Sequence, residues 1–147
     1  MHTTLLLLHS IFRYFVLIFL LIVLVRSYSG WQSKKEFTAL DNKFSLWLFI
    51  SGQIQFTLGL ILYFVSPIVI FSAASMKNPV TRYWLVEHIT MMIIAVALIS
   101  AARATSKKLP DPTAKHKRLF ILNLIALLII LVAVFSFKDR APFSITM

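Results

Sequence analysis

The chain has 147 residues, of which 59% are hydrophobic, and it carries a formal net charge of +10 without any cysteine. Its mean hydropathy of +0.86 is that of a membrane protein, and too little sequence lies outside the apolar runs for a soluble domain. The absence of cysteine excludes disulfides, thiolate-ligated haem, iron–sulfur clusters and covalent haem attachment through cysteine. The basic charge falls in short blocks between apolar runs, which does not favour a nucleic-acid surface.

Four apolar runs are long enough to cross a bilayer, whose hydrocarbon core of about 30 Å needs roughly 20 helical residues. Helices satisfy their own backbone hydrogen bonds in lipid, so each run is expected to be a transmembrane helix. The first run has no basic residues before it, and Arg13 interrupts it, so we expect it to stay as a helix rather than be cleaved as a signal peptide. The sequence predicts an all-α integral membrane four-helix bundle, a single domain over 1–147 with helices at about 5–25, 44–65, 80–103 and 117–137.

The basic residues predict the orientation. Ten of them lie in or beside the segments 26–43 and 103–118, against four in the second loop and the C-terminal tail. Cytoplasmic loops carry the excess of Lys and Arg, so these two segments are expected in the cytoplasm and both termini outside. The expected location is the bacterial inner membrane, with a multi-pass chain whose basic blocks face anionic lipid headgroups.

Polar residues also mark the helix ends. Asn78 before Pro79, and Asp111 before Pro112, each place a capping side chain ahead of a proline at the first helical position. Asp41 is a candidate cap for the second helix.

Four ionisable residues lie inside the apolar runs: His9 and Arg13 in the first, Glu87 and His88 in the third. Such groups are costly at membrane depth, so they usually face the bundle interior and mark a functional site. At 1.5 Å per helical residue, both histidines fall in the outer half of the bilayer. Two imidazoles from different helices suit the iron of one b-type haem.

Neighbouring residues fit the edge of such a cofactor. Arg13, one helical turn from His9, can pair with a haem propionate or with Glu87, and Arg82 is a second candidate for a propionate. The alternatives are that the His9 ring turns toward the headgroups and that Arg13 extends outward to the interface. His2 and His116 are expected to be solvated.

Helices two and four carry further polar or small residues near the bilayer middle. They either bond between helices, at about 0.6 kcal/mol per bond, or line a polar pocket for a quinone carbonyl or a proton path. Glycines in helix two leave room for a close helix or a flat cofactor. These residues are Ser51, Gln53, Gln55 and Asn123, with glycines Gly52 and Gly59.

The chain resembles small four-helix bacterial membrane proteins of the cytochrome b-like kind, related in character to copper-resistance D and invasion-regulator B type membrane domains. The resemblance implies a histidine on the first helix, His9, and a Glu-His pair on the third, Glu87 and His88. A histidine expected in helix two is replaced by Gln53, which argues against a second haem. The segments that carry the resemblance are LLHSIFRYFVL (7–17), GLILYFVSP (59–67), RYWLVEHITMMIIAVALI (82–99) and AKHKRLFILNLIALLII (114–130).

Two function classes remain open. One is an electron-transfer protein with a single bis-histidine haem b in the outer half, exchanging electrons between a quinol and a partner. The other is a haem-free membrane subunit or accessory protein, acting with other membrane subunits or as a homodimer. The sequence carries no hydrolase, kinase or nucleotide-binding motif, so a stand-alone enzyme is not favoured, and whether the chain is an enzyme stays open.

Overall fold

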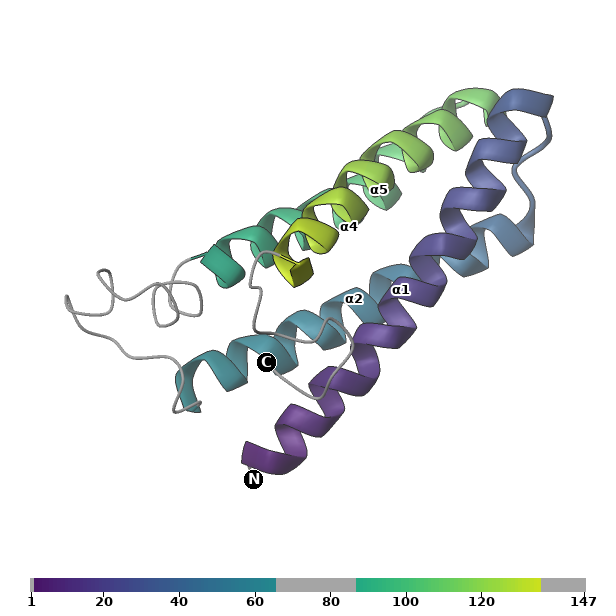
Figure 1. Cartoon of the computed structure of the whole chain (residues 1–147). Helices are drawn as coiled ribbons and strands as arrows, with labels where there is room; N and C mark the ends of the chain where they lie inside the picture. The colour runs from purple at the N-terminus through teal and green to yellow at the C-terminus, as the bar shows by residue number, and fades with distance from the viewer. Residues whose placement is uncertain (1, 66–86, 136–147) are drawn as a thin grey trace.

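The computed structural model describes residues 2–65 and 87–135, and these residues form four helices and no strand (Figure 1). Each helix is long and apolar enough to cross a membrane. The predicted all-α four-helix membrane bundle is therefore confirmed, while the side of the membrane on which the termini lie stays a prediction. The helices are α1 (His2–Ser33), α2 (Ala39–Val65), α4 (His88–Ser106) and α5 (Pro112–Phe135).

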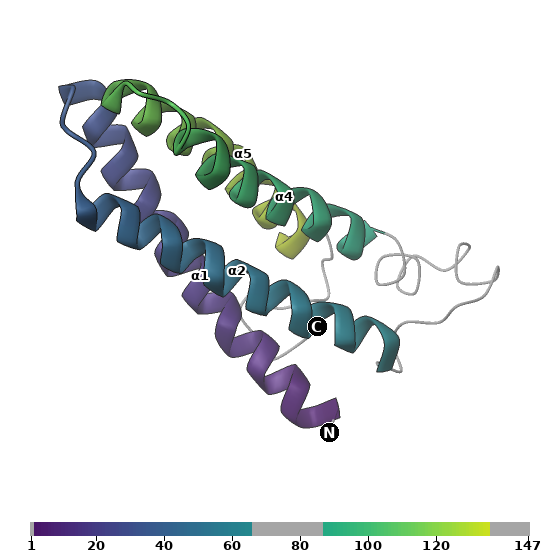
Figure 2. The ribbon, with the colours of Figure 1, turned by 180° about the vertical axis from the view of Figure 1, so that it is seen from behind.

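The helices pack as two antiparallel pairs, α1 with α2 and α4 with α5 (Figures 1 and 2). The pairs meet where α1 contacts α5 and α2 contacts α4. The short connections 34–38 and 107–111 lie at the same end of the bundle, which we call the loop end. Both views show the two pairs close together at the loop end and spread apart toward the opposite end, where α1 begins and the described part of α5 finishes.

The core is a narrow apolar stripe along the bundle axis. Buried residues on α1 and α5 recur at spacings of three and four, which places them on one helical face. Large aliphatic and aromatic side chains such as Ile18, Leu21, Val25 and Leu128 are instead half exposed or more. An exposed apolar exterior of this kind is suited to lipid rather than to water. The buried apolar residues of the central cluster are Val16, Leu20, Val23, Leu24, Leu48, Ala95, Ile99, Ala102, Leu119, Ala126 and Ile130.

The helices extend past the apolar runs that predicted them. Helix α1 continues to Ser33, because helix-compatible polar residues follow the run and Ser27 bonds to the carbonyl oxygen of Val23 in its own helix. Helix α2 begins at Ala39 rather than at 44, and α4 extends to Ser106 rather than 103. Helix α5 begins at Pro112, where the Asp111–Pro112 signal placed its first residue, rather than at 117, where the predicted transmembrane span begins. Positions 80–86 and 136–137 of the predicted helices lie outside the described residues.

Side-chain caps fix the helix ends at the loop end. Thr38 precedes α2 and forms a capping box with Asp41: the Thr38 amide donates to the Asp41 carboxylate over 2.9 Å, and the Asp41 amide donates to the Thr38 hydroxyl over 3.3 Å. Asp41 is thus the third residue of the helix. The sequence predicted it as the cap, whereas the cap is Thr38 and Asp41 is its partner in the capping box. Asp111 accepts from the Thr113 amide over 3.2 Å, which confirms it as the cap of α5. Asn78 and Pro79 lie outside the described residues.

Helix α1 ends in a left-handed turn. Lys34 has a φ of 52°, and the Lys35 amide donates to the carbonyl oxygen of Gly30 over 3.0 Å. This is the hydrogen bond of a Schellman motif, which usually has glycine at the left-handed position. The turn directs the chain across the start of α5 before α2 begins.

Candidate functional site

A small apolar cavity lies between α1, α2 and α4 in the half of the bundle away from the loop end. Its volume is about 50 Å³. Both histidines of the apolar runs contribute to it, His9 from α1 and His88 from the start of α4. The lining residues are His9, Gln55, Phe56, Gly59, Tyr63, His88, Ile89, Met92 and Val96.

The ring of His9 is seated against the glycine of helix α2. A Cβ atom added to Gly59 would lie 2.9 Å from His9 Cε1, closer than real Cβ atoms approach a neighbour. His9 is only 8% exposed, so its ring has little room to retreat. Gly59 therefore makes room for the imidazole of His9. The sequence had suggested only that this glycine makes room for a neighbouring helix or a flat cofactor. Gly52 has no such role, since a Cβ there meets nothing within 4 Å.

Polar groups other than the histidines also reach this cavity. Gln55 lies one turn before Gly59 on α2, and its side-chain oxygen is buried without a hydrogen-bond donor among the described residues. Tyr63 lies one turn after Gly59 and contributes its ring. A buried carbonyl oxygen without a donor is costly, so it is a candidate to receive a hydrogen bond from a ligand or a water. The sequence placed Gln55 among interhelical bonds or a quinone pocket and did not link it to the histidines.

The structure brings together two of the five predicted cofactor-binding residues. His9 and His88 line the cavity, whereas Arg13 and Glu87 are not among its lining residues. Arg13 is 8% exposed, and its guanidinium carbon lies 5.2 Å from the ring centre of Tyr14 on the same helix. Glu87 directly precedes α4 and is half-buried. Arg82 lies outside the described residues.

The donor set fits haem better than a free metal ion. Within residues 2–65 and 87–135, no three His, Cys, Asp or Glu side chains are grouped to hold an ion. Two imidazoles could hold haem iron, because the porphyrin would supply the remaining ligands. The volume is the difficulty: cofactor sites usually measure roughly 300–1,000 Å³, so side chains such as Met92 and Phe56 must move aside for a macrocycle.

The polar residues near the bilayer middle divide between two roles. The Gln53 amide donates to the Ser100 hydroxyl over 2.9 Å, which joins α2 to α4 and confirms the predicted interhelical bond. Ser51 instead bonds to the Leu48 carbonyl of its own helix. Asn123 is 1% exposed, and neither side-chain atom has a hydrogen-bond partner in the described part of the chain.

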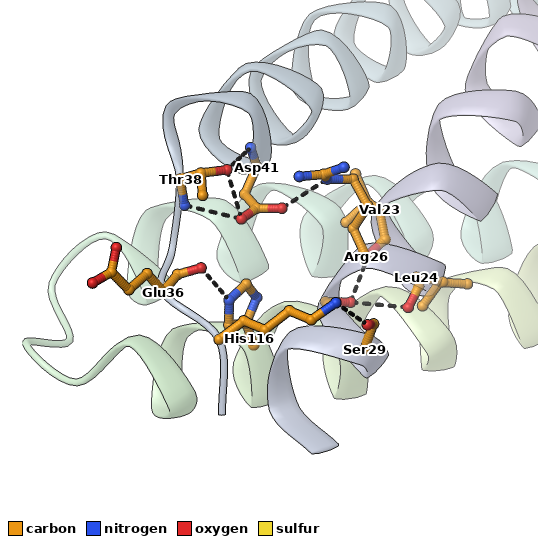
Figure 3. Close-up of polar contacts among 10 residues, drawn as sticks. Val23, Leu24, Arg26, Ser29, Glu36, Thr38, Asp41 and His116 are labelled. Atoms are coloured by element: carbon orange, nitrogen blue, oxygen red, sulfur yellow. Dashed lines mark hydrogen bonds and ion pairs between the residues drawn. The ribbon is translucent and has the colours of Figure 1, made fainter. Parts of the chain in front are cut away.

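The prediction that His116 is solvated is wrong. This residue of α5 is 1% exposed at the loop end, where its ring lies on Gly30 of α1. Its Nε2 lies 3.2 Å from the carbonyl oxygen of Glu36 in the connection between α1 and α2 (Figure 3). In the sequence His116 stands among basic residues beyond the apolar run, and it is buried only because α1 and the connection between α1 and α2 pack against it.

The loop end also carries an ion pair. Arg26 of α1 donates through Nε to the Asp41 carboxylate over 2.7 Å. Asp41 is 9% exposed, and its carboxylate also accepts hydrogen bonds from Thr38, so both of its oxygens have partners (Figure 3). On α4, Arg103 donates to the Ser45 hydroxyl over 3.1 Å and to the Asn42 carbonyl oxygen over 3.2 Å, which ties α4 to the start of α2.

Comparison of the chain with protein-family models, with curated proteins and with solved structures found no match.

Proposed function

We propose that this chain is a small b-type cytochrome-like electron-transfer protein of the membrane, in which His9 and His88 hold one haem in the outer half of the bilayer. The observation that supports it is that these two histidines, 79 positions apart in the sequence, line one apolar cavity. Bound there, the haem would supply one-electron transfer between a quinol and a partner protein.

The protein's own residues have distinct tasks in this proposal. His9 and His88 would each present a ring nitrogen to the iron. Gly59 keeps the His9 ring in place by leaving it room on α2. Apolar side chains of α2 and α4, among them Phe56, Met92 and Val96, exclude water from the space between the rings.

The arrangement of the helix pairs would allow the cavity between His9 and His88 to become larger. The pairs are farthest apart at the end where α1 and α4 begin (Figures 1 and 2), and His9 and His88 lie near those helix starts. A further separation there leaves the contacts of the loop end intact. Arg13, buried one turn from His9, is the proposed partner of a propionate or of Glu87, and Arg82 of a second propionate.

The second candidate is a haem-free membrane subunit or accessory protein, and the small volume of about 50 Å³ favours it. In that case His9 packs against Gly59 as a helix contact, and the half-exposed apolar exterior contacts lipid and other subunits or a second copy of the chain.

An absorption spectrum of the purified full chain distinguishes the two candidates. A Soret band that shifts on reduction, with the sharp α-band of a low-spin haem, is expected for the cytochrome. His9→Ala and His88→Ala should each abolish the low-spin spectrum, and Gly59→Ala should weaken haem retention because the added Cβ displaces the His9 ring. The matched control is His116→Gln, which changes a buried histidine at the loop end and should leave the spectrum unaltered.

Two outcomes would contradict the proposal. Protein that is folded in detergent, yet stays colourless after expression with excess haem and after addition of haem to membranes, supports the haem-free subunit. A spectrum retained in both His9→Ala and His88→Ala would show that other residues hold the haem.

A further inference from the structure

A second cavity lies at the loop end, where the connection between α1 and α2 crosses the start of α5. Its volume is about 280 Å³. Arg26, Lys35 and the hydroxyl-bearing Ser29 line it, together with the ring of His116. Glu36 and Asp41 line it as well, so the two cations favour an anionic ligand only if these two carboxylates are already engaged or turned away.

The buried imidazole has an unused nitrogen. A carbonyl oxygen only accepts hydrogen bonds, so Nε2 of His116 carries a proton and donates to Glu36. Nδ1 is buried and has no hydrogen-bond partner among the described residues. In Figure 3 the ring lies between the Glu36 carbonyl on one side and the Arg26 and Ser29 side chains of α1 on the other. The second nitrogen is covered by its surroundings, so a group inside the cavity reaches it only after a small shift of the ring or of the lining.

The acidic residues of the cavity do not oppose an anion. Both carboxylate oxygens of Asp41 are already used, one by Arg26 and the other by Thr38. The carboxylate of Glu36 points away from His116 in Figure 3, and its residue is exposed to solvent. Lys35 uses one of its three donors on the Ser29 hydroxyl, at 3.0 Å, which leaves two for a ligand.

The level of the cavity in the membrane suggests what the anion is. Cationic side chains around it lie over aromatic rings, with Lys117 Nζ 5.8 Å from the ring centre of Trp31 and Lys115 Nζ 5.3 Å from that of Phe37. Tryptophan and basic residues gather in this way where a helix leaves the hydrocarbon for the headgroups. Phosphate is the anionic group present at that level, and basic pockets between helices bind it.

We propose that the cavity beside His116 binds a phosphate group, carried either by an anionic phospholipid or by free phosphate. Lys35 and the outer edge of the Arg26 guanidinium contact its oxygens, and Nδ1 of His116 completes the site. A neutral ring accepts a hydrogen bond at Nδ1 from a phosphate hydroxyl, whereas a protonated ring donates one to a phosphate oxygen. This site is at the opposite end of the bundle from His9 and His88, so it does not depend on haem binding.

The test uses the full chain in an uncharged detergent with two probes, dioctanoyl phosphatidic acid and inorganic phosphate. Native mass spectrometry measures the lipid and titration calorimetry the phosphate. Lys35→Gln should weaken saturable binding about tenfold, the loss typical of one charge-assisted hydrogen bond. The matched control is Lys34→Gln, which removes the same charge one residue earlier, outside the cavity lining, and should change the affinity less than twofold.

The two probes separate the two sources of phosphate. Saturable binding of the lipid without binding of inorganic phosphate assigns the site to a headgroup, and competition by inorganic phosphate assigns it to the free ion. His116→Gln should lower the affinity as Lys35→Gln does; if it does not fold, the comparison of Lys35→Gln with Lys34→Gln still decides. Equal losses of affinity in Lys35→Gln and Lys34→Gln would show that binding depends only on surface charge, which would overturn the proposal. The absence of saturable binding with both probes would overturn it as well.

Discussion

Replacing Gly30 by alanine tests the contact that buries His116. A Cβ atom at position 30 would lie 2.5 Å from Cδ2, Cε1 and Nδ1 of the imidazole, closer than real Cβ atoms approach a neighbour. The ring is 1% exposed and lies 5.3 Å from the ring centre of Phe37, so it cannot turn aside without moving other atoms. The substitution therefore forces a displacement of α5 or of the connection that carries Glu36.

The expected loss of stability follows from three contributions. Overpacking of a filled site costs about 1–3 kcal/mol, and a broken bond from His116 to the Glu36 carbonyl costs about 1 kcal/mol. Alanine in place of glycine within a helix returns about 0.5–1 kcal/mol. The balance is a loss of about 2 kcal/mol in the free energy of unfolding of Gly30→Ala.

The assay is reversible unfolding in mixed detergent micelles, followed by far-ultraviolet circular dichroism. The matched control is Gly52→Ala on α2, where the added Cβ meets nothing within 4 Å and only the helical gain remains. That variant should be as stable as the parent chain or slightly more so. If Gly30→Ala matches Gly52→Ala, the packing of His116 on α1 is wrong. If the contact is right, His116→Ala in the Gly30→Ala background should cost less than in the parent, since neighbours in contact are not additive.

Three further predictions address other parts of the bundle. Gln53→Ala should lower the free energy of unfolding by about 0.6 kcal/mol, and Ser100→Ala should add little in the same background, because the two side chains bond to each other; a double-mutant cycle with zero coupling would contradict this. Thr38→Val should cost about 1 kcal/mol by removing the hydroxyl half of the capping box with Asp41, whereas Thr113→Val, whose described contact is through its backbone amide, should cost less. Reporter fusions after Lys35 and Lys108 should signal from the cytoplasm and a C-terminal fusion from outside, since ten basic residues lie in or beside the segments 26–43 and 103–118. A cytoplasmic signal from the C-terminal fusion would show that the orientation is the reverse.

Local sequence was sufficient for the helices and for some of their ends. Four apolar runs of sufficient length predict four helices in lipid, because unpaired backbone groups are too costly there for any other open structure. Asp111 before Pro112 predicted the start of α5 since both residues act on the adjacent turn. Gln53 was correctly placed between helices, as a polar side chain in an apolar run needs a partner from a neighbouring helix.

Contacts between distant residues were not predictable in the same way. His116 stands among basic residues beyond its apolar run, so hydropathy indicates solvent, and its burial depends on Gly30, 86 positions away. The pairing of Gly59 with His9 is likewise a contact between helices. The available signal was the glycines themselves: glycine within a helix costs about 0.5–1 kcal/mol relative to alanine, and this cost is tolerated where another group approaches the backbone closely.

The two ends of the bundle are held differently, and this separates the two proposals. From the middle toward the loop end, α2 is tied to α4 by Gln53 and Arg103, and α5 is tied to the α1–α2 connection by His116. Those links fix the helix pairs where they are close, so the cavity at His116 is bounded by parts that keep their spacing. Toward the other end the pairs spread (Figure 1), and a ligand between His9 and His88 can be accommodated by a change in that spread. A change in haem content is therefore expected to leave phosphate affinity unaltered, and the loss of phosphate binding in Lys35→Gln is expected to leave the spectrum unaltered.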